Sequence, residues 1–197
     1  NTKTMNESYL TNELFVLGEI KESDKRAVAV VGSREMTNRG RELTIKFVKE
    51  LVNEKITIVS GLARGVDTIA HQTALDNGGR TIAVLGSGID VIYPPENKKL
   101  SEEVIKNGAL VSGFPNGTKP YPKNFLARNQ IIVKMSLAVL VIEGKRRSGT
   151  ISTANHAANE SVEVFAIKGS EATDYLIENG ATAVQSPKEI VDYLNTL

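Results

Sequence analysis

The sequence predicts an α/β fold with a mostly parallel sheet and helices on both of its faces. One observation is the alternation of short apolar runs of strand length with stretches whose apolar residues recur every three or four positions, as in helices. A second is that four of the apolar runs lead into a loop containing Gly and Ser. Since parallel strands are joined by right-handed crossovers, these loops are expected at one edge of the sheet.

The four strand–loop steps predict a ligand site at that edge. They lie at residues 28–34, 56–65, 81–88 and 138–150. A strand that enters a helix through a glycine-rich turn exposes backbone N–H groups, which favour an anion such as phosphate. For the second step alone, the glycines have an equally good explanation as relief of a tight turn. Four such loops on one edge favour one shared site.

The remaining elements follow from apolar spacing, caps and breakers. Thr37 or Asn38 is expected to cap the first helix, and residues 113–124 form a long loop with several Gly and Pro residues. Strands are predicted at 27–32, 55–59, 80–85, 109–112, 137–142, 162–167 and 181–184, and helices at 38–53, 65–77, 96–107, 125–135, 150–158, 174–179 and 187–194.

The chain divides into a short N-terminal extension and one domain. Residues 1–26 show no clear period, although 9–17 could form a short helix or strand that docks on the body. Residues 27–197 carry the alternating pattern and are long enough to bury a proper core. We expect a single α/β domain from residue 27 onward.

Composition narrows the possible functions. The 197 residues are 41% hydrophobic and 24% charged, as is ordinary for a globular domain. We find no apolar run long enough for a membrane span and no signal-peptide pattern, and a cytoplasmic location fits. Cysteine is absent, and His71 and His156 are far apart, so we expect no disulfide, no metal site and no cofactor.

Charge is segregated along the chain. The net charge is only +1, yet the segment 119–147 holds seven basic residues against the single acid Glu143. This distribution favours an anionic partner at one face, while a solvated surface run is the alternative.

Motifs in a fixed order cover most of the chain, from about residue 27 to 184. They lie at 30–34, 60–71, 82–90, 93–94, 125–132 and 147–150. This series resembles the DNA-processing protein A family, also called Smf. The resemblance implies an extended Rossmann-like domain that binds single-stranded DNA, protects incoming DNA in natural transformation and helps to load a RecA-type recombinase. It also implies a homodimer without enzymatic activity.

The resemblance assigns a set of DNA-facing positions in this chain. They are Gly32, Ser33, Arg34, Ser60, Gly61, Phe125, Arg128, Arg147, Ser148 and Gly149. Arg34, at a strand end, suits a phosphate contact better than a structural salt bridge. Phe125 and Arg128 share a helix face, so that Phe125 could stack on a base while Arg128 holds a phosphate; Phe125 as a core residue is an equal alternative.

Asp67 and His71 are spaced to bond across one helical turn, and we expect a capping or core role for them instead of catalysis. Three departures from the family pattern stand out. This sequence does not include the N-terminal helical and C-terminal winged-helix domains of many members, so we expect either a fragment or a short member of the family. The segment 166–174 is short, and the helix after residue 150 is unusually polar.

Two other functions remain open at this point. A nucleotide-sensing domain would use the same phosphate loops without DNA. A nucleoside monophosphate phosphoribohydrolase, resembling the cytokinin-activating enzymes, would need a Glu at the position that Thr153 occupies. Without that carboxylate we see no general acid or base, so catalysis is not expected.

Overall fold

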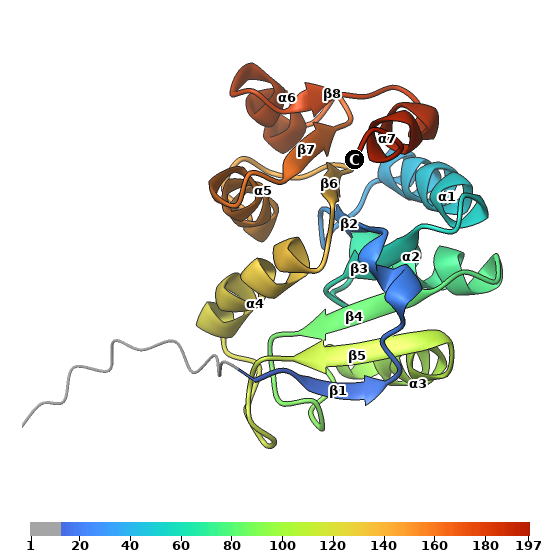
Figure 1. Ribbon diagram of the computed structural model, residues 1–197. Coiled ribbons are helices and arrows are strands. Elements are labelled where there is room, and N and C mark those ends of the chain that lie inside the picture. The colour runs from blue at the N-terminus through green and yellow to red at the C-terminus, as the bar shows by residue number, and fades with distance from the viewer. Residues whose placement is uncertain (1–12) are drawn as a thin grey trace, which may run out of the picture.

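The computed structural model describes residues 13–197, which form an eight-stranded sheet between two layers of helices (Figure 1). The strands are β1 (Phe15–Gly18), β2 (Ala27–Val31), β3 (Thr57–Ser60), β4 (Thr81–Leu85), β5 (Gly108–Ser112), β6 (Ala138–Val141), β7 (Glu163–Ala166) and β8 (Thr182–Ala183). Their order in the sheet is β1-β5-β4-β3-β2-β6-β7-β8. Every neighbouring pair is parallel except β1 with β5, which confirms the predicted α/β class.

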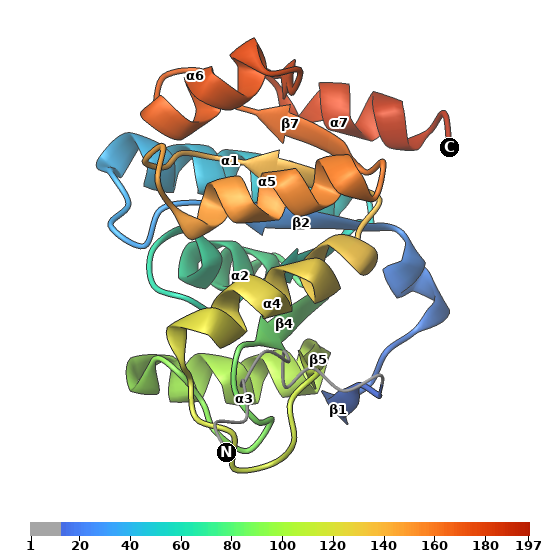
Figure 2. The ribbon, with the colours of Figure 1, turned by 90° about the vertical axis from the view of Figure 1, so that its left-hand side faces the viewer.

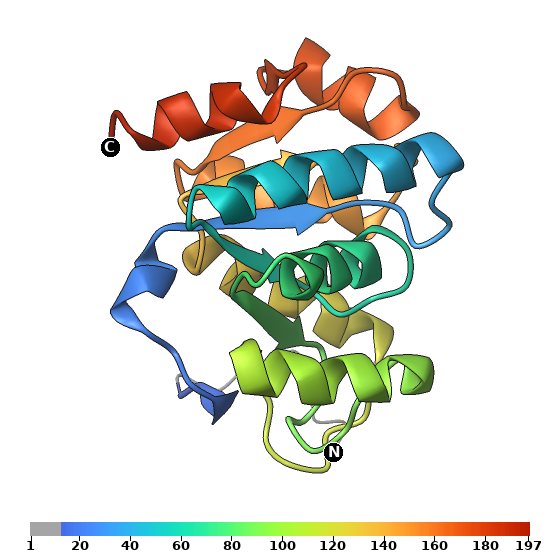
Figure 3. The same cartoon turned by 90° about the vertical axis from the view of Figure 1, so that its right-hand side faces the viewer.

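Helices cover both faces of the sheet. The helices are α1 (Asn38–Asn53), α2 (Val66–Asp76), α3 (Lys98–Asn107), α4 (Pro122–Lys134), α5 (Gly149–Asn159), α6 (Glu171–Glu178) and α7 (Pro187–Leu194), with short 3-10 turns at Glu22–Lys25 and Pro95–Asn97. Figure 2 shows α4, α5 and α6 on one face, and Figure 3 shows α1, α2, α3 and α7 on the other.

The central strands are apolar on both sides because both faces are covered. Along β2, Val28 and Val30 pack with α1, α2 and α7, whereas Ala27, Ala29 and Val31 pack with α4 and α5. Side chains alternate between the faces of a strand, so one run of five apolar residues contributes to two cores.

Several predicted boundaries move by a few residues for identifiable reasons. The Thr37 cap is confirmed, since its hydroxyl accepts a hydrogen bond from the Gly40 N–H. α4 begins at Pro122, earlier than predicted, because proline lacks the N–H that the first turn leaves unpaired anyway. α6 begins earlier than predicted, since Ser170 caps it through the Thr173 N–H.

Part of the predicted N-terminal extension belongs to the sheet. β1 runs antiparallel to β5, with Phe15 opposite Ser112. Asp24 is buried and accepts hydrogen bonds from Arg80 and from the Thr57 hydroxyl, which fixes the connection between β1 and β2. Residues 1–12, with the start of the element predicted at 9–17, lie outside the described residues.

The strand order reverses beside β2. The chain moves outward from β2 through β3, β4 and β5, and then returns to place β6 on the opposite side of β2. In open α/β sheets, such a reversal separates two adjacent loops at the carboxyl edge and leaves a crevice for a ligand. The crevice is therefore expected between the ends of β2 and β6.

Candidate functional site

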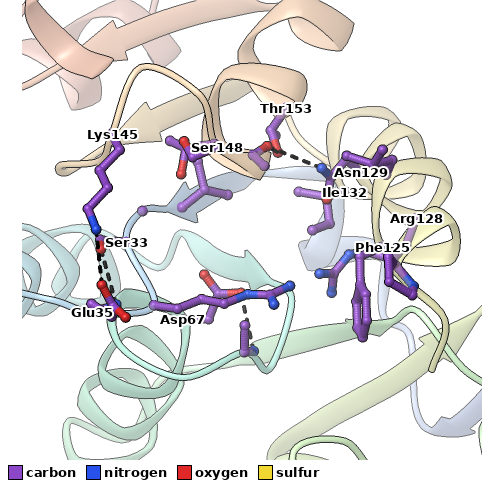
Figure 4. Close-up of a pocket in the computed structure, with 18 of the residues that line it drawn as sticks. Ser33, Glu35, Asp67, Phe125, Arg128, Asn129, Ile132, Lys145, Ser148 and Thr153 are labelled. Atoms are coloured by element: carbon purple, nitrogen blue, oxygen red, sulfur yellow. Dashed lines mark hydrogen bonds and ion pairs between the residues drawn. The ribbon is translucent and has the colours of Figure 1, made fainter. Parts of the chain in front are cut away.

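A cavity of about 540 Å³ opens at that point, between α4, α5 and the loops after β2 and β6 (Figure 4). It is lined by all the predicted site residues except Ser60 and Gly61. The fold thus brings together side chains from distant parts of the sequence: Gly32, Ser33 and Arg34 after β2, Phe125 and Arg128 on α4, and Arg147, Ser148 and Gly149 after β6.

Two guanidinium groups lie over the ring of Phe125. The Arg34 guanidinium carbon lies 5.1 Å from the ring centroid and that of Arg128 lies 5.8 Å away, both within cation–π range. The Tyr93 ring centre is 5.7 Å from that of Phe125. Phe125 is half-buried and lines the cavity. The structure therefore does not place it in the core, which was the alternative to base stacking.

Arg128, the predicted phosphate contact on α4, has a buried side chain. It is only 4% exposed, and its Nη1 donates hydrogen bonds to the carbonyl oxygens of Gly61 and Val84. It therefore braces the ends of β3 and β4 while it lines the cavity. Its Nε has no hydrogen-bond partner among the described residues. Burial lowers the pKa of Arg128 to about 10, and the charge of Arg34 acts in the same direction.

The loop after β3 does not offer its N–H groups to a ligand. The Asp67 carboxylate accepts from the Gly61 N–H at 3.1 Å and the Ala63 N–H at 3.3 Å, while the Val66 N–H donates to the Ser33 carbonyl. Burial raises the pKa of Asp67, against the effect of the Arg128 charge. The structure thus favours a tight turn over an anion site for this loop.

The small residues of this turn are required by close packing. Gly65 has a φ of +73°, and a Cβ there would lie 2.1 Å from the Ser33 carbonyl oxygen. The buried Ser60 hydroxyl donates to the Val30 carbonyl, and a Cβ on Gly61 would collide with Arg128. The predicted positions Ser60 and Gly61 therefore support the site from behind.

His71 has the predicted core role but a different partner. Its Nδ1 lies 2.7 Å from the Thr81 hydroxyl, and the bond to Asp67 that the spacing allows is not formed. Burial lowers the pKa of His71 to about 3, so the ring is neutral near pH 7.

The glycine loop after β4 does not line the cavity, although Gly86 packs against the Phe125 ring, where a Cβ would lie 2.6 Å from Cδ1. The Ser87 hydroxyl donates to the Val91 carbonyl, and the Gly88 N–H donates to the Thr118 carbonyl. These bonds tie the loop to its own continuation and to residues 113–121. Tyr93, further along, lines the cavity, so this glycine loop supports the site behind Phe125 and does not offer its own N–H groups there.

The N-terminus of α5 faces the cavity with unpaired polar groups. The Ser148 hydroxyl forms no cap, and its buried Oγ has no partner among the described residues. The Gly149 carbonyl accepts from Asn129 at 3.3 Å and from the Thr153 hydroxyl at 3.2 Å, which fixes the first turn. A Cβ on Gly149 would meet nothing within 4 Å, so the space beside it is open.

The cavity mouth is basic and contains one ion pair. Arg34, Lys145 and Arg147 are exposed, and the Lys145 amine lies 3.1 Å from the Glu35 carboxylate across the mouth (Figure 4). Arg146 instead lies over the Tyr175 ring, 4.7 Å from its centroid. Of the three basic residues 145–147, the first and the third thus line the cavity, and Arg146 does not.

Backbone hydrogen bonds connect the loops along this edge. The Ser33 carbonyl accepts from Val66, and the Ser33 N–H donates to the Glu143 carbonyl. On the far side, the Gly144 N–H donates to the Ser170 hydroxyl and the Gly144 carbonyl accepts from Ala172. These bonds form a chain of contacts from α2 to α6.

Glu143, the one acid of the basic segment, does not line the cavity. Its carboxylate is buried and accepts at 2.6 Å from both the N–H and the hydroxyl of Thr37. It therefore fixes the start of α1. Within residues 13–197 there is no cluster of three or more potential metal ligands, and no helix is long and apolar enough to cross a membrane.

Sequence reasoning did not select Asn129, Tyr93 and Glu35 for the site. The signal for the first two was present, because Asn129 and Tyr93 both fall inside the motifs of the family resemblance. Glu35 follows Arg34 directly, but only the packing of two loops shows that it reaches Lys145.

These features define a class of protein, a Rossmann-like α/β domain with a cavity where the strand order reverses, which we call the switch-point cavity. The cavity combines cationic groups, an aromatic ring and a helix N-terminus. It therefore suits an anionic ligand with a flat apolar part. The sequence comparison then gives the particular family. The model of the DNA recombination-mediator protein A family matches residues 4–195, and the chain belongs to this family.

The relatives are longer than this chain. Protein Smf of Synechocystis is 39% identical over 194 residues, covering 93% of this chain and 49% of the relative. The DNA processing protein DprA of Streptococcus pneumoniae is 41% identical over 184 residues, covering 90% of this chain and 65% of the relative. The chain thus spans about half to two thirds of these relatives.

Solved structures agree with this membership. The crystal structure of DprA from S. pneumoniae superposes with a TM-score of 0.86 at 40% identity, covering 91% of this chain and 65% of that one. A structure of DNA processing protein A from Helicobacter pylori, described for its single-stranded DNA binding mode, gives 0.86 at 30% identity over 94% of this chain and 87% of that one. A molybdenum cofactor binding protein, at 0.65 and 20% identity over 86% of this chain and 95% of that one, shares the fold alone.

Proposed function

We propose that this chain binds single-stranded DNA, with little sequence preference, in the switch-point cavity. Phosphates contact the arginines at the mouth, and an unpaired base stacks on the ring of Phe125. Family membership supports this proposal, as does the single-stranded DNA binding mode described for the H. pylori relative.

One observation carries the proposal: two guanidinium groups approach one aromatic ring, and their combined charge exceeds that of the nearby carboxylate, Asp67. Arg34 and Arg128 both approach Phe125, and within residues 13–197 neither forms an ion pair. Burial lowers the pKa of Arg128, the Asp67 charge acts to raise it, and repulsion from the Arg34 charge acts to lower it further. An anion bound between the two arginines would relieve that repulsion, so the pair is suited to a phosphate.

The aromatic ring favours single strands over duplex. Stacking on Phe125 needs an unstacked base, and the base edges of a duplex are engaged in pairing. Shape thus adds discrimination to a charge attraction that on its own would suit any nucleic acid.

The same proposal includes the wider role that the family resemblance implies. The protein acts in the cytoplasm as a homodimer, protects incoming DNA during natural transformation and assists a RecA-type recombinase in loading. It is not an enzyme, because Thr153 occupies the position of the catalytic Glu in the related hydrolases and its hydroxyl donates to the Gly149 carbonyl.

A second candidate, a nucleotide-sensing domain, is favoured by the size of the cavity. A volume of about 540 Å³ lies in the range of pockets for small molecules and suits one nucleotide. A sensor would bind one mononucleotide tightly, and its affinity would not increase for a longer strand.

Fluorescence anisotropy tests these candidates. Labelled single strands, matched duplexes and mononucleotides are titrated with the protein at several salt concentrations. We expect single strands to bind tightest, with an affinity that rises with length. Equal or tighter binding to duplex would contradict the proposal, and length-independent binding would favour the sensor.

A further inference from the structure

We propose that the inner end of the cavity is a subsite for a terminal phosphate monoester of a nucleotide, either at the end of a DNA strand or on a free nucleoside monophosphate. The inference rests on the proposed function, since it takes a nucleotide as the ligand. It adds that the cavity holds the end of a DNA strand and not its middle.

The cavity has a closed polar floor beneath its open mouth. Its floor consists of polar side chains that are each less than a tenth exposed: Asp67, Arg128, Asn129, Thr150 and Thr153. Its mouth consists of exposed residues such as Arg34, Lys145 and Arg147. A strand that passed across the mouth would leave the floor unused, and a strand that entered it would have no exit.

Residues that line the cavity carry polar groups without hydrogen-bond partners among the described residues. Four N–H groups in the first turn of α5 have no partner within the helix, and the buried Ser148 Oγ is unpartnered among the described residues. The Nε of Arg128, a side chain that is 96% buried, is likewise unpartnered on the α4 side. Helix N-terminus, hydroxyl and guanidinium together suit a compact anion.

The one acid on the floor is occupied elsewhere. The Asp67 carboxylate accepts from Gly61 and Ala63 on the α2 side, and Arg128 offsets its charge. The anion is therefore expected on the α5 side, beside Gly149, where a Cβ would meet open space. Glycine at that point allows the backbone to approach a phosphate closely.

Charge distinguishes an end from an internal linkage. A phosphodiester carries one negative charge, whereas a phosphate monoester carries about 1.5 to 2 at pH 7, with a second pKa of about 6. Two guanidinium groups that face the single carboxylate of Asp67, together with a helix dipole, favour the more highly charged group.

Competition experiments on the full 197-residue chain test the inference. The competitors are an oligothymidylate with hydroxyl ends, the same strand with a 5′- or a 3′-phosphate, a strand one nucleotide longer with hydroxyl ends, and a circular single strand. Thymidine monophosphate and thymidine form a matched pair for the free nucleotide. The longer strand controls for the added charge.

We expect one of the phosphorylated strands to bind roughly five- to tenfold tighter than the hydroxyl-ended strands. The advantage should shrink as the pH falls below about 6, where the monoester loses charge. Thymidine monophosphate should compete better than thymidine, and the circular strand should compete poorly.

Gly149→Ala locates the subsite. The added methyl enters open space, so folding should be unaffected, yet it should block the approach of phosphate to the α5 N-terminus. We expect the phosphate advantage to disappear while the melting temperature stays equal or rises. Asn155→Ala, an exposed change on the same helix outside the cavity, is the matched control and should keep the advantage.

The outcomes separate this inference from the proposed function. Tight single-strand binding with no phosphate advantage, and with equal competition by circles, would overturn the subsite alone. A phosphate advantage that survives Gly149→Ala would overturn its location. Binding of thymidine monophosphate without strand binding would support the subsite and overturn the proposed DNA function. Binding of neither would overturn both.

Discussion

Arg34 and Arg147 are the exposed arginines that line the cavity, and each can contact a phosphate without leaving the surface. Changing either to Ala should lower the log–log slope of affinity against salt by roughly 0.7, because one contact to a single strand releases less counterion. Salt titrations by anisotropy measure the slope. Arg41→Ala, an exposed change on α1, should leave it unchanged. Unchanged slopes for both cavity variants would mean that the DNA runs elsewhere.

Phe125 should act through stacking instead of charge. Because its ring is half-buried at the cavity, Phe125→Ala should weaken single-strand binding by roughly 1–3 kcal/mol with nearly the same salt slope. The melting curve should change little, and Tyr121→Ala, an exposed aromatic outside the cavity, serves as control. A decrease of roughly 3–5 kcal/mol in the free energy of unfolding would instead indicate that Phe125 acts as a core residue.

At the scale of elements, the Glu35–Lys145 ion pair joins the loops after β2 and β6 across the cavity mouth. A bound phosphate would have to compete with Glu35 for the Lys145 amine. Glu35→Gln should therefore tighten single-strand binding by a few-fold at low salt, since exposed pairs are worth about 0.2–1 kcal/mol. Anisotropy against Glu50→Gln, an exposed acid of α1, measures the effect. Weaker binding would show that Glu35 helps the ligand.

The turn between β1 and β2 depends on a buried carboxylate. Burial acts to raise the pKa of Asp24, but hydrogen bonds from Arg80, the Lys21 N–H and Thr57 together lower it below its ordinary value. Asp24 therefore contributes its full share to the free energy of unfolding above its pKa in the unfolded chain, about 3.9. This contribution is lost as the pH falls through the lower pKa of Asp24 in the folded state.

Asp24→Asn should lower the free energy of unfolding at pH 7 by roughly 1–3 kcal/mol, because the Arg80 bonds lose their charge. Below about pH 3.9 the difference from the original chain should narrow, since that chain also loses the carboxylate charge. Chemical denaturation at pH 7 and at pH 3 tests both points, with the exposed Glu22→Gln as control. A difference that stays constant with pH would contradict the titration of Asp24.

For the whole molecule, most of the fold could be predicted because hydrophobic periodicity is a local signal. The run of apolar residues in β2 and the cap at Thr37 determine their elements without reference to distant parts of the chain. Strand order could not be obtained this way. That β1 closes the sheet against β5 depends on a pairing across about ninety residues, which no local pattern encodes.

Most residues of the site could be predicted from the sequence, but their burial and hydrogen bonds could not. The spacing of Phe125 and Arg128 places both on one face of α4, but the rotation of α4 against the sheet decides that Arg128 is buried. The loop from Ser60 to Gly65 looks like a phosphate loop in sequence. Only the folded turn shows that Asp67 takes two of its N–H groups.

This chain should not release base from nucleoside monophosphates. Thr153 has a hydroxyl in place of a carboxylate and donates it to the Gly149 carbonyl, while the Glu143 carboxylate is held by Thr37 and does not line the cavity. Chromatography of free base after incubation with purified protein measures this activity. Release that disappears with a Glu143→Gln variant would show that this carboxylate reaches the substrate and would overturn the non-enzyme proposal.

The hydrogen-bond chain along the carboxyl edge also has a dynamic consequence. Val66 is bonded to the Ser33 carbonyl, Ser33 donates to Glu143, and Gly144 is bonded to Ser170 and Ala172, so no loop can open without straining the next. Such a series behaves as one cooperative unit in local unfolding. Whatever tightens the loop after β2 should therefore slow amide exchange as far away as the first turn of α6, well beyond any atom that it touches.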